Sequence, residues 1–272
     1  STHVGSSAAS DVYKRQNSKS SRAWEKEMNF QDKHIAITGA ASGLGRALAV
    51  ALSQEEAILY LSDIDDEGLA ETVQQCSGAH AMNVDVSKME SIHAWKEQIE
   101  KETDHLDLLF NNAGVTILER FEDHSLEDWE WVLGVNVWGV IHGTKAFLPM
   151  LRKSQHGRIV NISSIFGIVA LPGQAAYCAS KFAVRGISEV LGEELDDVGV
   201  TVVHPGGIAT NIVKKARSQH EDYKGALIRF FERHTLSPKE AADQIVYGVR
   251  KEQSRIMVSK DCLLYTSDAA DD

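Results

Sequence analysis

The chain has 272 residues, of which 43% are hydrophobic and 25% charged, a balance that excludes a wholly disordered protein and predicts a substantial core. Its 28 lysines and arginines face 39 acidic residues, and the net charge of −11 disfavours a surface that binds nucleic acid or anionic lipid. A small-molecule partner is therefore expected, and the length suits one large α/β domain.

The two ends of the chain differ from its patterned middle. Residues 1–27 are rich in serine and charge, and residues 11–16 and 262–272 resemble translated library-linker sequence. We therefore expect disordered or linker-derived tails at 1–27 and 262–272, and one folded domain at 28–261. A native disordered tail is the alternative. On the linker interpretation, the natural sequence continues past Asp261.

From Lys33 onward, short apolar runs alternate with longer segments of helical periodicity, which indicates repeated βαβ units and a mainly parallel sheet. Seven strands are predicted, at residues 34–38, 57–62, 79–84, 106–110, 158–163, 200–203 and 255–258. Helices are predicted at residues 43–54, 66–75, 87–102, 126–151, 175–197 and 238–251. Residues 207–236 are polar and weakly patterned and are expected to form a flap.

Small residues separate the first predicted strand from the first helix, in the sequence Thr38-Gly39-Ala40-Ala41-Ser42-Gly43-Leu44-Gly45. Glycine allows a sharp turn and a close approach of the backbone to a ligand. The free amides and positive dipole at the start of the following helix suit a pyrophosphate. Because a glycine-rich turn is a weak signal alone, a plain strand-to-helix turn is the alternative.

Asp63 ends the second predicted strand, 18 residues after Gly45, where a carboxylate can accept both ribose hydroxyl protons of a dinucleotide. A 2′-phosphate there would be repelled, since neither Ala40, Ala41 nor Ile64 offers a compensating cation. NAD is therefore expected in preference to NADP. The alternative role for Asp63 is a turn or N-cap residue.

Tyr177 and Lys181 are four residues apart and lie on one face of a predicted helix. A nearby ammonium stabilises a phenolate and is expected to move the pKa of Tyr177 from about 10 toward neutrality. Ser164, 13 residues before Tyr177, follows a predicted strand, where its hydroxyl could bind the same substrate oxygen. The alternative roles are a packing residue for Tyr177, a solvated helix charge for Lys181 and a strand-end cap for Ser164.

Together these motifs resemble the short-chain dehydrogenase/reductase family over residues 33–258. The resemblance rests on the glycine turn, Asn111-Asn112-Ala113-Gly114, Asn136, Ser164, Tyr177 with Lys181, and Pro205-Gly206. It implies a single doubly wound, Rossmann-like α/β domain with helices on both faces of the sheet. It also implies an NAD-dependent oxidoreductase that interconverts a secondary alcohol and a ketone by hydride transfer, without a metal.

The resemblance assigns catalytic roles to Asn136, Ser164, Tyr177 and Lys181. Tyr177 is implied to be the acid/base, and Ser164 to steady the substrate oxygen. Lys181 is implied to bind the nicotinamide ribose and tune Tyr177, and Asn136 to hold a water that links Lys181 to solvent.

The resemblance also implies a set of cofactor contacts. Asp85 and Val86 would meet the adenine ring, residues 112–114 the adenosine and ribose side, and Ile208 and Thr210 the carboxamide. The full set is Gly39, Ser42, Gly43, Leu44, Gly45, Asp63, Asp85, Val86, Asn112, Ala113, Gly114, Tyr177, Lys181, Pro205, Gly206, Ile208 and Thr210.

Two alternative functions share this fold. One is a dinucleotide-binding sensor or scaffold without turnover, and the other is a carbonyl reductase that prefers NADP. The presence of all four catalytic residue types favours catalysis, and Asp63 disfavours NADP.

The substrate pocket is expected to be mostly apolar, with a wall formed by Ile165, Phe166, Leu171, Gln174 and the segment 209–236. Phe166 and Leu171 could instead be core residues. Lys214, Lys215 and Arg217 form a basic cluster that could meet an anion, although such a run is more often a solvated face.

The predicted helix at 126–151 carries Trp129, Trp131 and Trp138 and is apolar around much of its circumference, which predicts burial on two sides. The family resemblance implies a homodimer or homotetramer, and a deeply packed helix in a monomer is the alternative. Cys76, Cys178 and Cys262 lack metal-ligand or disulfide spacing, which fits a reducing cytoplasm. No apolar run is long enough for membrane insertion.

Overall fold

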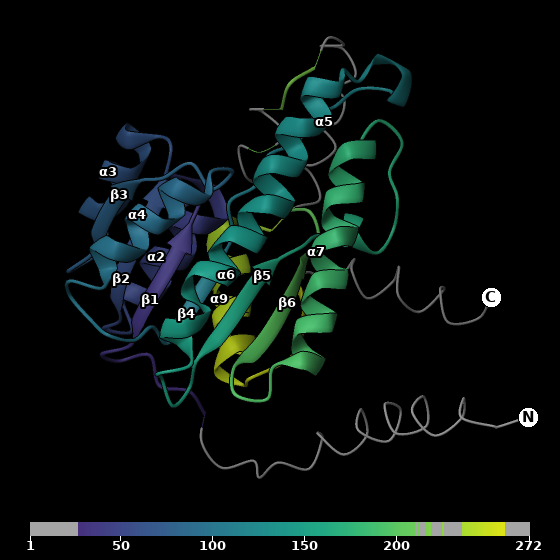
Figure 1. Cartoon of the computed structure of the whole chain (residues 1–272). Coiled ribbons are helices and arrows are strands. Elements are labelled where there is room, and N and C mark those ends of the chain that lie inside the picture. Colours follow the sequence, from purple (N-terminus) through teal and green to yellow (C-terminus); the bar gives the residue numbers. More distant parts are fainter. Residues whose placement is uncertain (1–26, 210–211, 213–215, 219–224, 226–235, 259–272) are drawn as a thin grey trace, which may run out of the picture.

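A computed structural model describes residues 27–209, 212, 216–218, 225 and 236–258 (Figure 1). A seven-stranded, fully parallel sheet has the order β3-β2-β1-β4-β5-β6-β7. The strands are β1 (His34–Thr38), β2 (Ile58–Asp63), β3 (His80–Asn83), β4 (Leu108–Asn111), β5 (Arg158–Ile162), β6 (Gly199–Pro205) and β7 (Arg255–Val258). The predicted α/β class and strand count are confirmed.

Helices cover both faces of this sheet (Figure 1). They are α2 (Gly43–Ser53), α3 (Asp66–Gln74), α4 (Met89–Ile99), α5 (Leu126–Leu133), α6 (Gly139–Leu151), α7 (Ala175–Glu194) and α9 (Pro238–Arg250). The strand order reverses between β1 and β4, and in such sheets the carboxyl ends of the strands at this switch point open a crevice. Most predicted boundaries agree with these elements to within three residues.

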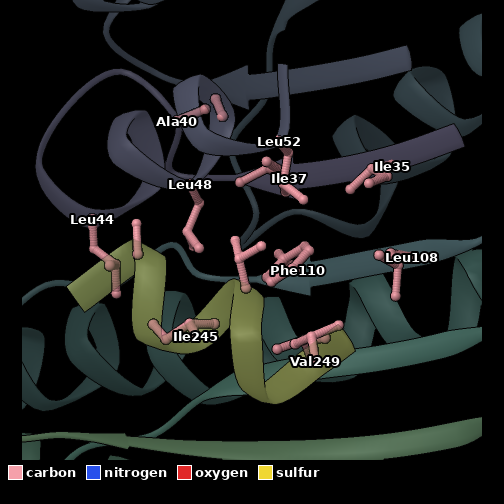
Figure 2. Packing of buried hydrophobic residues seen from close by; sticks show 14 of the residues in the cluster. Ile35, Ile37, Ala40, Leu44, Leu48, Leu52, Leu108, Phe110, Ile245 and Val249 are labelled. Carbon is pink, nitrogen blue, oxygen red and sulfur yellow. The ribbon is translucent and has the colours of Figure 1, made fainter. Parts of the chain in front are cut away.

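One side of the sheet is sealed by α2 and α9, which pack on the side chains that alternate along the central strands (Figure 2). The labelled members of this core are Ile35, Ile37, Ala40, Leu44, Leu48, Leu52, Leu108, Phe110, Ile245 and Val249. This packing holds the start of α2, and hence the glycine turn before it, at the carboxyl end of β1.

The predicted helix at 126–151 is wrong as a continuous α-helix, because a π-helical turn over Gly134–Trp138 separates α5 from α6. The wider turn brings Asn136 fully into the interior, where its side chain bonds to backbone and side-chain groups of other segments. Within a single chain this segment is not buried on two sides, because the Trp138 side chain is 54% exposed.

None of the helices in the described ranges is both long enough and apolar enough to span a membrane.

Candidate active site

A cavity of about 480 Å³ opens at the carboxyl ends of the central strands. Its lining includes every sequence-predicted site residue except two. Thr210 lies outside the described residues, and Asn136 lies behind the wall rather than in it. The fold therefore brings the glycine turn, Asp63 and the Tyr177-Lys181 pair to one cavity.

The glycine turn has the backbone geometry that its composition predicts. Gly39 and Gly43 have positive φ angles of 68° and 54°, which other residues adopt only with strain. A Cβ on Gly45 would lie 2.1 Å from the carbonyl oxygen of Gly39. Ser42 is the N-cap of α2 but makes no side-chain cap hydrogen bond within the described part, so the first amides of α2 remain available to an anion at the cavity.

Asn112 braces the glycine turn from β4. Its side-chain amide donates to the carbonyl oxygens of Thr38, at 2.8 Å, and Gly39, at 3.1 Å. The Thr38 hydroxyl in turn accepts from the amides of Asn112 and Ala113, each at 3.0 Å. Asn112 therefore positions the turn as well as lining the cavity, a role that the sequence analysis missed.

Asp63 lies in the cavity wall, but backbone groups already occupy much of its carboxylate. One oxygen accepts from the amide of Ala41 at 2.9 Å, and the other from the amides of Ile64 and Asp65 at 2.8 and 3.1 Å. Since a carboxylate has about four acceptor positions, it has fewer left for a ribose than expected. The N-cap alternative is wrong, because Asp65 caps α3. The turn role of Asp63 is confirmed by these backbone bonds, and its contact with a ribose stays a prediction.

Arg46 is a basic residue at the glycine turn that the sequence analysis missed. Its guanidinium donates to the carbonyl oxygens of Ala41 and Gly68 and pairs with Glu71 at 2.8 Å. The signal was its place directly after Gly45, at the start of α2. These contacts tie the turn to α3 and leave Arg46 engaged by protein groups.

Asp85 lies at the predicted adenine end of the cavity together with Val86. Burial by itself would raise the pKa of Asp85, but hydrogen bonds from Ser87 and the charge of Lys88 outweigh it and hold the pKa below its ordinary value. Asp85 is therefore an ionised acceptor at neutral pH.

The three proposed catalytic side chains meet at the other end of the cavity. The Lys181 ammonium is 5.6 Å from the centre of the Tyr177 ring and donates to the carbonyl oxygen of Ile162 at 2.9 Å. The Ser164 hydroxyl accepts from the amide of Phe166 at 3.1 Å, so Ser164 caps the short helical turn after β5 and also lines the cavity. The cap interpretation of Ser164 is confirmed, and its place in the cavity wall leaves the functional role as a prediction.

The expected downward shift of the Tyr177 pKa is wrong for this structure. Burial raises the pKa of Tyr177 to about 12, and a hydrogen bond with Ser164 opposes this only in part. Burial also lowers the pKa of Lys181 to about 8. Removal of water disfavours the charged form of each group, so at neutral pH Tyr177 holds its proton while Lys181 is still mostly charged.

The side chain of Asn136 is held by protein groups. Its amide nitrogen donates to the carbonyl oxygen of Val115 and to the hydroxyl of Ser180, both at 2.9 Å, and its oxygen accepts from the amide of Val115 at 2.8 Å. Both side-chain hydrogens are thus engaged by the protein. The Asn136 side chain therefore fixes the loop after Gly114 against α7. Its implied role of holding a water that links Lys181 to solvent stays a prediction.

The cavity wall includes residues that the sequence analysis missed, namely Val115, Thr116, Trp131 and Val135, and it includes Ile212 from the predicted segment 209–236. Of the predicted lining, Phe166 and Gln174 are confirmed, whereas Ile165 is a core residue and Leu171 lies outside the wall. The only signal for Val115 and Thr116 was their place directly after Asn112-Ala113-Gly114.

Neither Arg217 nor Cys178 is part of the cavity wall. Lys214 and Lys215 lie outside the described residues, and Arg217 pairs with Asp128 at 3.2 Å. Cys178 is buried, and this burial raises its thiol pKa, as expected of a small core residue. Within the described segments, histidine, cysteine and acidic side chains form no group of three suited to a metal ion.

The lowered pKa of Lys181 predicts a pH dependence of stability. Between the folded value of about 8 and the ordinary value of 10.5, the unfolded chain binds this proton more tightly, so stability rises with pH. From pH 8 to 9.5 the free energy of unfolding should rise by about 1.5 kcal/mol through this residue. Urea unfolding of the parent and of Lys181→Met at both pH values measures it. If the free energy of unfolding rose equally in the two proteins, the lowered pKa of Lys181 would be contradicted.

The chain matches the family model described as short chain dehydrogenase over residues 33–221. It is 42% identical over 240 residues to SadH of Mycobacterium tuberculosis, named as an oxidoreductase, covering 85% of this chain and 87% of that protein. It is 35% identical over 229 residues to the cyclopentanol dehydrogenase of a Comamonas species, covering 82% of this chain and 92% of that protein.

Solved structures show the same fold. A short-chain dehydrogenase/reductase from Burkholderia phymatum in complex with NAD is 29% identical with a TM-score of 0.81, covering 88% of this chain and 93% of that one. An alcohol dehydrogenase from Thermococcus sibiricus complexed with 5-hydroxy-NADP is 25% identical with a TM-score of 0.73, covering 84% of this chain and 96% of that one.

Proposed function

Because this chain belongs to the short-chain dehydrogenase family, we propose that it interconverts a secondary alcohol and a ketone with NAD as the cofactor. The observation that carries the proposal is that Ser164, Tyr177 and Lys181 line the same cavity as the glycine turn. A protein that only senses a dinucleotide has no need of this catalytic set. The similarity to a cyclopentanol dehydrogenase supports an alcohol substrate.

In this proposal the bound nicotinamide supplies the carbon that accepts or donates hydride. Tyr177 transfers a proton to or from the substrate oxygen, and Ser164 holds that oxygen by a hydrogen bond. Since the raised pKa keeps Tyr177 protonated at neutral pH, the site is ready to act as an acid on a ketone. Alcohol oxidation needs the phenolate and is favoured by alkaline pH. Below pH 8 Lys181 is mostly charged, and its ammonium then stabilises the negative charge that develops on the Tyr177 oxygen as the proton leaves.

The direct test is a screen of secondary alcohols, diols, sugars and hydroxysteroids with NAD, followed by the absorbance of reduced cofactor. Cyclopentanol belongs in the panel because of the Comamonas relative. Turnover of at least one secondary alcohol supports an enzyme. NADH binding without turnover across the panel and across the matching ketones would favour a sensor or scaffold.

NAD preference is proposed on the basis of the Asp63 carboxylate in the cavity wall. Fluorescence titration should show tighter binding of NADH than of NADPH. Asp63→Asn removes the carboxylate charge that repels the 2′-phosphate of NADPH. The ratio of NADH affinity to NADPH affinity should therefore fall about tenfold, which corresponds to about 1.4 kcal/mol. Asparagine keeps the acceptor for the amides of Ile64 and Asp65 but loses the acceptor for the amide of Ala41, so the readout is the ratio of the two affinities and not either value alone.

Asp66→Asn is the matched control, because Asp66 is an exposed acid near Asp63 that is not part of the cavity wall. It should leave both affinities unchanged. Equal affinities in the parent protein would remove the NAD preference and favour the NADP-dependent reductase. The observation that favours an NADP-dependent reductase is the Thermococcus alcohol dehydrogenase complexed with 5-hydroxy-NADP.

The proposal places the enzyme in a reducing cytoplasm as a homodimer or homotetramer. Cys76 and Cys178 are buried free thiols. Trp138, Phe182 and Val190 expose apolar surface on the π-helical turn and α7, which supports a second chain as partner.

A further inference from the structure

Residues 216–218 lie against the pocket wall and are called the clasp here. Arg217 forms a parallel bridge with Ile117, and the amide of Leu118 donates to the carbonyl oxygen of Arg217 at 3.0 Å. The hydroxyl of Ser218 donates to the carbonyl oxygen of Leu118 at 2.9 Å, and Ala216 is buried. The clasp is therefore held by its backbone next to the loop that follows Gly114.

The Arg217 side chain reaches from the clasp to α5. The central carbon of its guanidinium lies 3.8 Å from the centre of the Trp131 ring, within the range of a cation–π contact. Its Nη1 lies 3.2 Å from a carboxylate oxygen of Asp128. Asp128 and Trp131 are three residues apart on one helix face, so the carboxylate holds the guanidinium over the indole.

Trp131 belongs to the substrate end of the cavity. Its side chain packs on a small buried cluster of Ile117, Val132 and Ala176, and Ala176 directly precedes Tyr177. Trp131 also lines the cavity together with Phe166, whose ring meets the Tyr177 ring edge to face at 6.4 Å. Two aromatic side chains thus bound the space beside the proposed acid/base.

We infer that Trp131 sets the shape of substrate that the cavity accepts and that Arg217 is its positioning residue. This inference rests on the proposed function and deepens it. A fixed aromatic wall favours an alcohol or ketone whose reacting carbon lies in an alicyclic ring or is bonded to a flat ring. Such a wall offers a large apolar contact with little conformational entropy to lose. The Thr116-Gln174 pair, at 3.4 Å, is a polar contact within this otherwise apolar wall.

The first test compares cyclohexanol with 2-butanol, two secondary alcohols that differ in ring content. Arg217→Leu should raise KM for cyclohexanol about three- to fivefold, leave KM for 2-butanol within about twofold, and leave kcat nearly unchanged. Arg217→Lys keeps the charge but not the planar stack and should show most of the same effect. Arg120→Leu is the matched control, since Arg120 pairs with Glu122 on the surface and is not part of the cavity wall.

The second test needs no substrate. A double-mutant cycle of Arg217→Leu and Trp131→Leu on urea unfolding should show a coupling of about two- to fivefold in the unfolding equilibrium constant. A coupling of this size supports the contact even if the parent turns over no alcohol, in which case only the proposed function fails. Additive single effects, or an Arg217→Leu loss that is equal for both alcohols, would overturn the inference.

Discussion

Replacing Tyr177 by phenylalanine is expected to lower kcat/KM by about 10²- to 10⁴-fold, the usual worth of a positioned proton donor. The change removes one oxygen and keeps the ring, whose contact with Phe166 is unaffected. NADH affinity should therefore stay within about threefold of the parent. Initial rates on any alcohol found by the screen and fluorescence titration of NADH measure the two quantities separately.

Tyr247→Phe is the control for this experiment. Tyr247 lies on α9, is 58% exposed and is not part of the cavity wall, so both kcat/KM and NADH affinity should be unchanged. Undiminished turnover by Tyr177→Phe would refute the acid/base assignment. Loss of NADH binding in the same variant would show that the ring, and not its hydroxyl, organises the site.

A methyl group on Gly45 is expected to disrupt dinucleotide binding. The Cβ of Gly45→Ala would lie 2.1 Å from the Gly39 carbonyl oxygen and 2.6 Å from the Asn112 amide nitrogen, so the glycine turn must move. A weakening of NADH binding by at least about 10²-fold is expected, since the first contact lies in the glycine turn that is proposed to face the pyrophosphate and the second is with the residue that braces this turn. Titration calorimetry measures it, with thermal unfolding to follow stability.

Gly192→Ala is the matched control, because it makes the same change in α7 away from the face that carries Phe182 and Val190. Within the described part of the chain, a Cβ at Gly192 would meet no atom within 4 Å outside the backbone of its own helix. Alanine in a helix interior should then stabilise the protein by up to about 1 kcal/mol. Normal NADH affinity in Gly45→Ala would show that the turn does not hold the cofactor.

Much of the fold and site could be read from local patterns. Alternation of apolar strands with amphipathic helices predicted the parallel sheet, because each pattern depends on neighbouring residues alone. The four-residue spacing of Tyr177 and Lys181 placed both on one helix face for the same reason. The small residues of the glycine turn predicted its positive φ angles, which are a property of the residue type.

Other properties depend on groups that meet only after folding. The pKa of Tyr177 moves upward because desolvation by surrounding segments exceeds the lowering effect of its hydrogen bond with Ser164. The π-helical turn at Asn136 forms where its side chain bonds to Val115 and Ser180, and a 3.6-residue period carries no sign of it. Trp131 lines the cavity and contacts Arg217, which is far along the chain, and such contacts arise from chain topology and not from sequence spacing.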